Sequence, residues 1–201
     1  MKRIREKVRI DYRIIFGIIE EGSKVLDLGC GPGYLLKILK KEKKIKAYGI
    51  EIKEEFIYKC MEKGLTVFHG DIESGLLEYP SSSFDYIILN QSLQEIKNFE
   101  FLLKDALRVG KKVIIGFPNF AHIKARIDLF FRGIAPTTSS LPYGWYNSPN
   151  VHFLSIKDFK IYCRKNEIEI IKIYNLGKEK EIKIFPNVFA LNSIFLIRKK
   201  F

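Results

Sequence analysis

Residues Val25-Leu-Asp-Leu-Gly-Cys-Gly-Pro-Gly33 read as a buried strand, a glycine-rich turn and the start of a helix. Gly29, Gly31 and Gly33 permit positive φ and let a ligand approach the backbone closely, as a nucleotide-binding turn requires. A dinucleotide-binding turn reads GxGxxG, whereas here the third glycine comes one position early and Tyr34 takes the place of the last glycine. The stretch therefore predicts an α/β fold with a ligand at this turn, and the ligand is not a dinucleotide.

The charge beside the turn narrows the choice of ligand. Asp27 precedes the first glycine by two positions. A carboxylate there repels a pyrophosphate, but it attracts a ligand that carries an ammonium and a sulfonium and no phosphate. S-adenosylmethionine has this charge pattern, so we expect it, or its product S-adenosylhomocysteine, to be the cofactor.

Length and composition indicate one ordinary globular domain. The chain has 201 residues, of which 47% are hydrophobic and 29% charged. Its three cysteines, Cys30, Cys60 and Cys163, are odd in number and fit no metal-binding spacing, so we expect neither disulfides nor a metal site. No apolar run is long enough for a signal peptide or a membrane span, which predicts a cytoplasmic protein with no membrane partner.

The net charge of +12 raises the possibility of nucleic-acid binding. The lysines, however, are scattered: residues 37–46 alternate charged and apolar positions, and residues 178–185 mix both signs. No stretch interleaves arginine with aromatics as a base-stacking surface does. We therefore interpret the charge as a solvated surface, with nucleic acid disfavoured as a partner.

Strand-like and helix-like segments alternate through the first 117 residues. An amphipathic helix over 4–21 comes first, and short strands apolar on both faces then alternate with helices, which predicts a parallel sheet covered on both sides. The expected strands are 24–28, 47–52, 65–69, 84–90 and 112–117, and the expected helices are 34–40, 54–63 and 101–107. The ligand crevice should lie at the carboxyl ends of the strands, near the first one.

The pattern changes after residue 118. Residues 119–132 look helical, 133–152 are an aperiodic segment with three prolines, and 155–165 form a helix with Ser155 as N-cap and Asp158 at its third position. Strands at 167–174 and 193–199 should finish the sheet as an antiparallel pair. The prediction is one domain, 1–201, with a doubly wound, mostly parallel, seven-stranded Rossmann-like sheet and a terminal antiparallel strand. Its parts are an N-terminal helix (1–21), a cofactor-binding core (22–117), a loop and helix cap (118–165) and C-terminal strands (166–201).

Two further carboxylates follow strand ends. Glu51 ends the second strand and is suited to accept both ribose hydroxyls, a reading favoured over a solvent-exposed glutamate. Asp71 follows the third strand and can accept the adenine amine while Ile72 packs on the ring; the alternative is a helix-capping aspartate. The expected cofactor-binding residues are Asp27, Gly29, Cys30, Gly31, Gly33, Glu51, Ile52, Asp71, Ile72 and Asn90.

These motifs resemble a known family. VLDLGCGPG, GIEI, GDIE and SSSFDYIILN resemble the successive landmarks of class I S-adenosylmethionine-dependent methyltransferases over about residues 20–117. The chain further resembles the methionine biosynthesis protein MetW nearly from end to end, through Arg13 and the segments 63–65, 70–76, 84–94, 107–110, 117–122 (FPNFAH) and 141–152 (LPYGWYNSPNVH). Glu95-Ile96 departs from the Ala-Thr that the family tends to have.

The resemblance implies a protein of amino-acid biosynthesis that acts with or on a homoserine O-acyltransferase. Two other functions stay open: a transferase that methylates a small-molecule acceptor, and a methyltransferase-fold protein acting on RNA, which the missing basic-aromatic pattern weakens. After the fourth strand the chain reads Asn90-Gln-Ser-Leu rather than the Asn/Asp-Pro-Pro-Tyr/Phe of amino-methyltransferases, which argues against base amines as acceptors.

The remaining candidates lie in the second half. His122 and His152 are possible catalytic bases, and purely structural roles for both are equally consistent with the sequence. The proline-pinned segment 133–152 should lie over the mouth of the cofactor crevice and present a surface for an acyltransferase partner or an acceptor. Its candidate contact residues are Tyr143, Trp145, Tyr146, Asn150 and His152.

Overall fold

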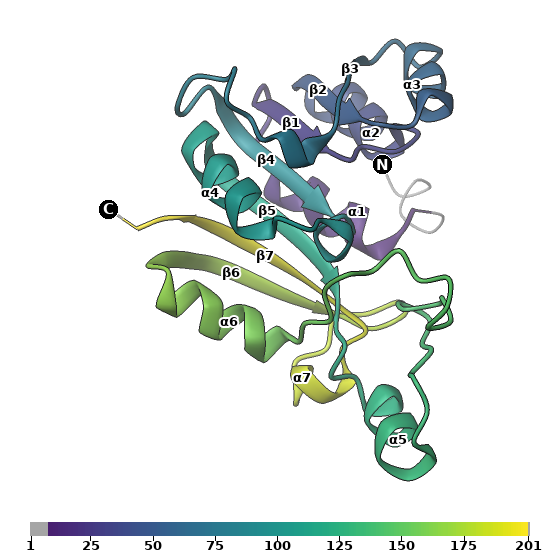
Figure 1. Cartoon of the computed structure of the whole chain (residues 1–201). Coiled ribbons are helices and arrows are strands. Elements are labelled where there is room, and N and C mark those ends of the chain that lie inside the picture. The colour runs from purple at the N-terminus through teal and green to yellow at the C-terminus, as the bar shows by residue number, and fades with distance from the viewer. Residues whose placement is uncertain (1–7, 201) are drawn as a thin grey trace.

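The computed structural model describes residues 8–200, so the first part of the expected helix over 4–21 lies outside the described residues. The elements of the described chain, shown in Figure 1, are α1 (Ile10–Ile18), β1 (Lys24–Leu28), α2 (Tyr34–Lys43), β2 (Lys46–Glu51), α3 (Glu54–Met61), β3 (Thr66–His69), η2 (Ile72–Ser74), β4 (Phe84–Asn90), η3 (Leu93–Glu95), α4 (Phe99–Val109), β5 (Gly110–Pro118), α5 (Ile123–Arg132), α6 (Ile156–Lys165), β6 (Ile168–Leu176), α7 (Pro186–Phe189) and β7 (Asn192–Lys199).

The strands of the described chain form one seven-stranded sheet in the order β3-β2-β1-β4-β5-β7-β6. The first five strands pair in parallel, and β7 runs antiparallel to both β5 and β6. The predicted fold class is confirmed. Because the strand order reverses at β1, the carboxyl ends of β1 and β4 flank the crevice in which such sheets bind ligands.

Side chains alternate along the strands and build a hydrophobic core on each face of the sheet. In β4, Ile87 and Leu89 join the core under α4 and α6, while Tyr86 and Ile88 join the core under α1, α2 and α3. Figure 1 shows α4 and α6 on the face turned toward the viewer. Both faces of the sheet are therefore buried, which explains why its strands read as continuous apolar runs.

The predicted helices over 119–132 and 54–63 extend beyond the observed ones. The helix expected over 119–132 begins only at Ile123, because the buried Asn119 turns the chain and His122 caps the helix. The helix expected over 54–63 ends at Met61, ahead of a turn in which Gly64 adopts a φ of +67°. The capping box at the start of α6 is present as predicted.

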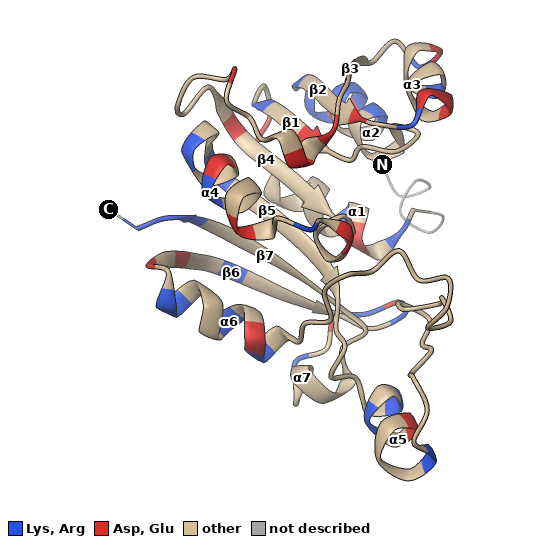
Figure 2. Cartoon of the chain, viewed as in Figure 1, with Lys and Arg blue, Asp and Glu red and all other residues tan. Residues whose placement is uncertain are grey.

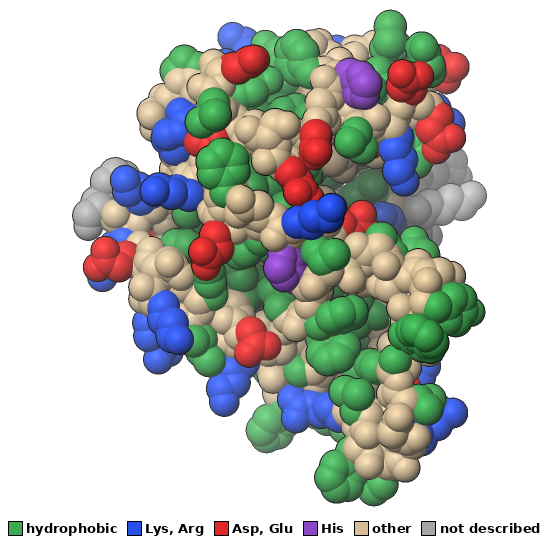
Figure 3. Space-filling model, in the orientation of Figure 1, with side chains coloured by type: hydrophobic (Ala, Val, Ile, Leu, Met, Phe, Trp, Pro, Cys, Tyr) green, Lys and Arg blue, Asp and Glu red, His purple; other side chains and the backbone are tan. Residues whose placement is uncertain are grey.

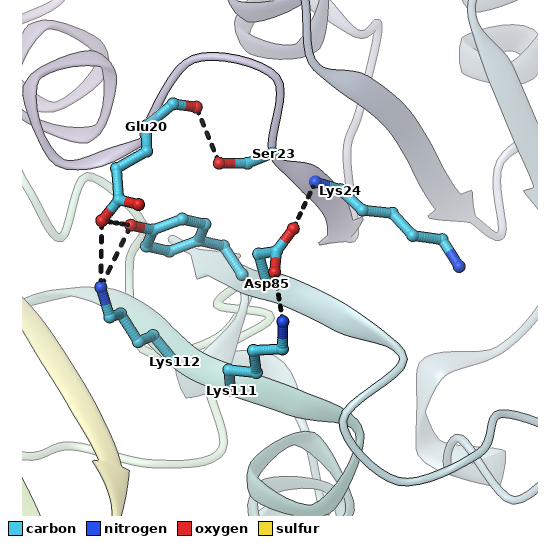
Figure 4. Close-up of polar contacts among 7 residues, drawn as sticks. Glu20, Ser23, Lys24, Asp85, Lys111 and Lys112 are labelled. Carbon is cyan, nitrogen blue, oxygen red and sulfur yellow. Dashed lines mark hydrogen bonds and ion pairs between the residues drawn. The ribbon is translucent and has the colours of Figure 1, made fainter.

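The amino-terminal edge of the sheet, opposite the crevice, holds a network of ion pairs (Figure 4). Asp85 accepts hydrogen bonds from the backbone of Lys24 at 2.9 Å and from Lys111 at 2.8 Å, and Lys112 lies 3.1 Å from Glu20. Figure 2 shows Lys and Arg spread over several helices and strand ends rather than gathered on one face. This distribution favours a solvated surface. Within residues 8–200, every helix is too short or too polar to cross a bilayer.

Candidate functional site

The glycine-rich turn has the backbone that its sequence predicts. Gly29, Gly31 and Gly33 adopt φ values of +74°, +54° and +73°. A Cβ on Gly33 would lie 2.7 Å from the sulfur of Cys60, whereas one on Gly31 would meet no atom within 4 Å. Gly33 is therefore required for packing inside the protein, while Gly31 faces open space that a ligand can fill.

Cys30 lies within the turn with its side chain buried. Its thiol and that of Cys60 both point at the carbonyl oxygen of Gly31, at 3.7 and 3.2 Å. Burial raises the pKa of the Cys30 thiol far above its usual value. The thiol is therefore unreactive, and Cys30 contributes to the site through its backbone.

Glu51 ties the end of β2 to the glycine-rich turn. Its side chain is buried; Oε2 accepts a hydrogen bond from Gly31 N–H at 2.8 Å, and Oε1 accepts from the N–H groups of Ile52 and Lys53, both at 3.0 Å. A carboxylate oxygen accepts about two hydrogen bonds. Oε1 is therefore saturated by the protein, and Oε2 retains capacity for one more donor.

Asp27, near the carboxyl end of β1, is the second buried carboxylate beside the glycine-rich turn. It is 4% exposed, and burial together with the nearby charge of Glu51 raises its pKa to about 7. Two desolvated carboxylates near each other favour a bound cation, because a positive charge offsets both the lost hydration and their repulsion.

Asp71 and its neighbours follow the carboxyl end of β3, which lies beside that of β2. Asp71 is exposed, and its Oδ1 accepts a hydrogen bond from Glu73 N–H at 2.9 Å, so it caps η2 in this structure. Ile52, directly after Glu51, is 55% exposed and presents an apolar surface. Ile72 is partly buried against the core.

Asn90, at the end of β4, is held by a residue that the sequence reasoning missed. Its Nδ2 donates to Asp11 of α1 at 2.8 Å, and Asp11 is buried and pairs with Arg9 at 2.6 Å. A signal was present, since Asp11 stands four positions before Ile15 on the apolar face of the first helix. A carboxylate at such a position needs buried partners, and Asn90 is one of them.

The segment after β4 connects the glycine-rich turn to residues 133–152. Ser92 donates from Oγ to Leu28 O at 3.3 Å and lies against Gly29. Two positions later, the carbonyl of Gln94 accepts hydrogen bonds from Val151 N–H at 2.8 Å and His152 N–H at 3.0 Å. The end of the 133–152 segment is therefore attached to the loop that packs on the turn.

The two candidate histidines lie in different surroundings. His122 caps α5, with Nδ1 accepting from Lys124 N–H at 3.2 Å, and burial lowers its pKa. His152 lines a cavity of about 370 Å³ together with Leu93 and Phe159, and its Nε2 is buried without a hydrogen-bond partner among the described residues. His122 thus has a structural role, whereas His152 has an unused polar atom.

The aromatic residues of 133–152 lie on the surface. Trp145 and Tyr146 are exposed over more than three quarters of their area, and Tyr143 over about half. Asn150 is partly buried, and its N–H donates to Ser148 Oγ at 3.1 Å. These rings therefore do not fill the protein core. Their expected position over the mouth of the crevice stays a prediction.

Comparison with known proteins identifies similar sequences. The family model described as methionine biosynthesis protein MetW matches residues 9–197. A bifunctional methionine biosynthesis protein MetXA/MetW from Rhodopirellula baltica is 35% identical over an alignment of 162 residues, and the match covers 76% of this chain and 26% of the relative. An uncharacterized methyltransferase, YdaC, from Bacillus subtilis is 32% identical over 115 residues, covering 51% and 61% of the two chains. The chain thus spans about a quarter of the length of the MetXA/MetW relative and about three fifths of the length of YdaC.

Solved structures share the fold at low sequence identity. A SAM-dependent methyltransferase from Archaeoglobus fulgidus matches with a TM-score of 0.69 and 18% identity over 97% of this chain and 94% of that one. A possible histamine N-methyltransferase from Thermotoga maritima matches with a TM-score of 0.66 and 20% identity over 94% and 87%. The architecture is that of Rossmann-like SAM-dependent methyltransferases.

Proposed function

Because the chain belongs to the methionine biosynthesis protein MetW family, we propose that it binds S-adenosylmethionine or S-adenosylhomocysteine and acts with, or regulates, a homoserine O-acyltransferase. The observation that carries the cofactor assignment is the pair of buried carboxylates, Asp27 and Glu51, beside a turn of three left-handed glycines. The relative whose name joins MetXA and MetW in one chain supports the acyltransferase assignment.

The residues of the crevice fit this cofactor. Asp27 faces the cationic end of the ligand, where an ammonium restores the charge compensation that burial removes. Glu51 offers the remaining acceptor capacity of Oε2 to a ribose hydroxyl. The open space at Gly31 lets the ligand contact the turn directly.

The remaining proposed contacts lie farther from the turn. Ile52 and Ile72 flank the adenine ring, and Asp71 accepts from its amine through Oδ2, because Oδ1 already caps η2. Asn90 lies at the opposite, methionine end, held in place by Asp11. When bound, S-adenosylmethionine supplies a methyl group that is already activated for transfer.

Regulation of a partner requires that the cofactor site and the partner surface communicate. Gln94 links the two regions, because its carbonyl accepts hydrogen bonds from the N–H groups of Val151 and His152. Ser92, two residues earlier in the chain, packs on Gly29 of the turn. We propose that Tyr143, Trp145, Tyr146, Asn150 and His152 face the partner, and that cofactor binding at the turn alters their arrangement through this attachment.

A second function, methyl transfer to a small molecule, is favoured by one observation. The buried Nε2 of His152 has no partner among the described residues and lines a cavity beside η3. Such a nitrogen can accept a hydrogen bond from a bound small molecule, the methyl acceptor, or donate one to it. In that case His152 would orient the acceptor or remove its proton.

One pair of experiments separates the two functions. Calorimetry measures whether the protein binds S-adenosylmethionine. The acylation of homoserine by the acyltransferase from the same genome is then measured with and without the protein and the cofactor. Faster acylation in the presence of the protein supports the first function. Unchanged acylation, together with S-adenosylhomocysteine formation in the presence of an added small molecule, supports the second.

A further inference from the structure

Helix α5 and residues 133–152, which we call the aromatic arm, carry apolar side chains on the outside of the molecule. Phe130, Phe131, Trp145 and Tyr146 are 82%, 75%, 82% and 76% exposed. The rings form two edge-to-face pairs, with centroids 4.8 Å apart for the phenylalanines and 5.8 Å apart for Trp145 and Tyr146. Figure 3 shows hydrophobic side chains gathered in this part of the molecule, at the lower right. Exposed apolar patches of this kind mark interaction sites.

The arm holds these side chains on a fixed backbone. Lys124 of α5 donates to Thr137 O at 2.6 Å and thereby joins the helix to the following segment. Gly133, at φ +60°, ends α5 with its N–H bonded to Asp128 O. Leu141 is buried and anchors the middle of the segment. A surface ordered before binding loses less conformational entropy on association, so the arm is suited to recognise a partner.

The charges of the arm argue against two classes of partner. Residues 133–152 contain no charged side chain, and this segment is tan throughout in Figure 2. Of the three cations of α5, Arg132 forms an ion pair with Asp128 at 2.9 Å, while Lys124 and Arg126 donate hydrogen bonds to the backbone carbonyls of Thr137 and Ala121 at 2.6 and 2.7 Å. Nucleic acids and anionic membranes are recognised through free lysines and arginines. An uncharged aromatic surface on a protein of net charge +12 instead fits an apolar patch on another protein.

We propose that the aromatic arm is the docking surface for the homoserine acyltransferase, with Phe130, Phe131, Trp145 and Tyr146 as its anchors. This inference rests on the proposed function. In the MetXA/MetW relative, the stretch matching this chain is 26% of the length, and its name places both proteins in one chain. Two proteins that work together as separate chains need a noncovalent interface, and large exposed aromatic residues are the side chains that most often carry its binding energy.

The test measures affinity between the purified full-length chain and the purified acyltransferase from the same genome, by biolayer interferometry. The double variant Phe130→Ser/Phe131→Ser and the single variant Trp145→Ser should each weaken binding about tenfold or more. Leu77→Ser is the matched control, because Leu77 is 71% exposed and lies outside the arm. All three variants should bind S-adenosylmethionine like the wild type, which also shows that they are folded.

Four outcomes contradict the inference. They differ in whether they also contradict the proposed function. If the wild type binds the acyltransferase and both arm variants bind it equally well, the docking surface is wrong while the proposed function stands. If the wild type does not bind the acyltransferase, the proposed partnership fails as well. If light scattering shows a dimer of the chain that the double variant dissociates, with acyltransferase affinity unchanged, the arm binds a second copy. If the wild type binds vesicles of anionic phospholipid and the double variant does not, the arm is a membrane-binding surface.

Discussion

The carboxylate of Glu51, at the end of β2, accepts a hydrogen bond from the backbone N–H of Gly31, in the turn after β1, at 2.8 Å. The residue proposed to hold the ribose therefore also fixes the turn that the ligand contacts. Because Glu51 is buried, this bond forms where water competes little for either group. Substitutions at Glu51 should consequently act on the cofactor and on the turn together.

Two replacements of Glu51 should weaken cofactor binding to different extents. Glu51→Ala should weaken S-adenosylmethionine binding by about 1.5–3 kcal/mol, since it removes a charge-assisted hydrogen bond and frees the turn. Glu51→Gln keeps one acceptor oxygen and the side-chain volume, so its loss should be smaller. Isothermal titration calorimetry measures both affinities. Equal affinities for Glu51→Ala and the wild type would remove Glu51 from the site.

Gly31 and Gly33 should respond differently to the same substitution. Gly31→Val should abolish cofactor binding while the protein stays folded, because a Cβ at this position enters open space, with no atom of another part of the chain within 4 Å. Its positive φ costs about 1–2 kcal/mol for a residue with a Cβ. Gly33→Val should instead destabilise the fold, because its Cβ would collide with Cys60. Thermal unfolding and calorimetry on both variants check this; normal binding by Gly31→Val would place the ligand elsewhere.

Cofactor affinity should depend on the protonation of Asp27. Its pKa is raised to about 7 in the empty protein, and a bound ammonium lowers it, so binding below pH 7 must expel a proton. Affinity for S-adenosylmethionine should therefore rise as the pH increases from about 5.5 to 7 and then level off. In Asp27→Asn the affinity should be weaker and this dependence should disappear. A wild-type affinity that stays constant across this pH range would contradict the assignment.

Asn119 should contribute strongly to stability. The residue is fully buried; its Nδ2 donates to the carbonyls of Asn187 and Ala190, and its Oδ1 accepts from Ala121 N–H at 3.2 Å and Ile156 N–H at 3.4 Å. Asn119→Ala leaves these backbone groups unpaired and should lower the free energy of unfolding by about 2–4 kcal/mol. Urea denaturation measures the change. A loss below about 0.5 kcal/mol would show that water replaces the side chain fully.

Local sequence patterns were sufficient to predict much of the fold. The strands at Lys24–Leu28 and Phe84–Asn90 are apolar runs bounded by turns, and both were predicted with the correct ends. The capping box of Ser155 and Asp158 is likewise a local signature, because both partners lie within one helical turn. The turn glycines were predicted for the same reason, since positive φ depends on the residue itself.

The missed features depend on contacts between distant segments. Asn119 stops the helix expected over 119–132 through bonds to residues more than 35 positions away. Asp11 accepts a hydrogen bond from Asn90, 79 positions away in the sequence, and no local pattern identifies that partner. The exposure of Phe130 and Phe131 is a third case, because helical periodicity does not show that the outer face of α5 lacks a covering element.

The acidic glycine-rich turn should bind a sulfonium cofactor rather than a dinucleotide. The most direct test is calorimetric titration of the wild-type protein with S-adenosylmethionine and, separately, with NAD⁺ at the same concentrations. We expect saturable binding of S-adenosylmethionine at one site per chain and no measurable heat of binding for NAD⁺. Binding of NAD⁺, or no binding of S-adenosylmethionine, would contradict it.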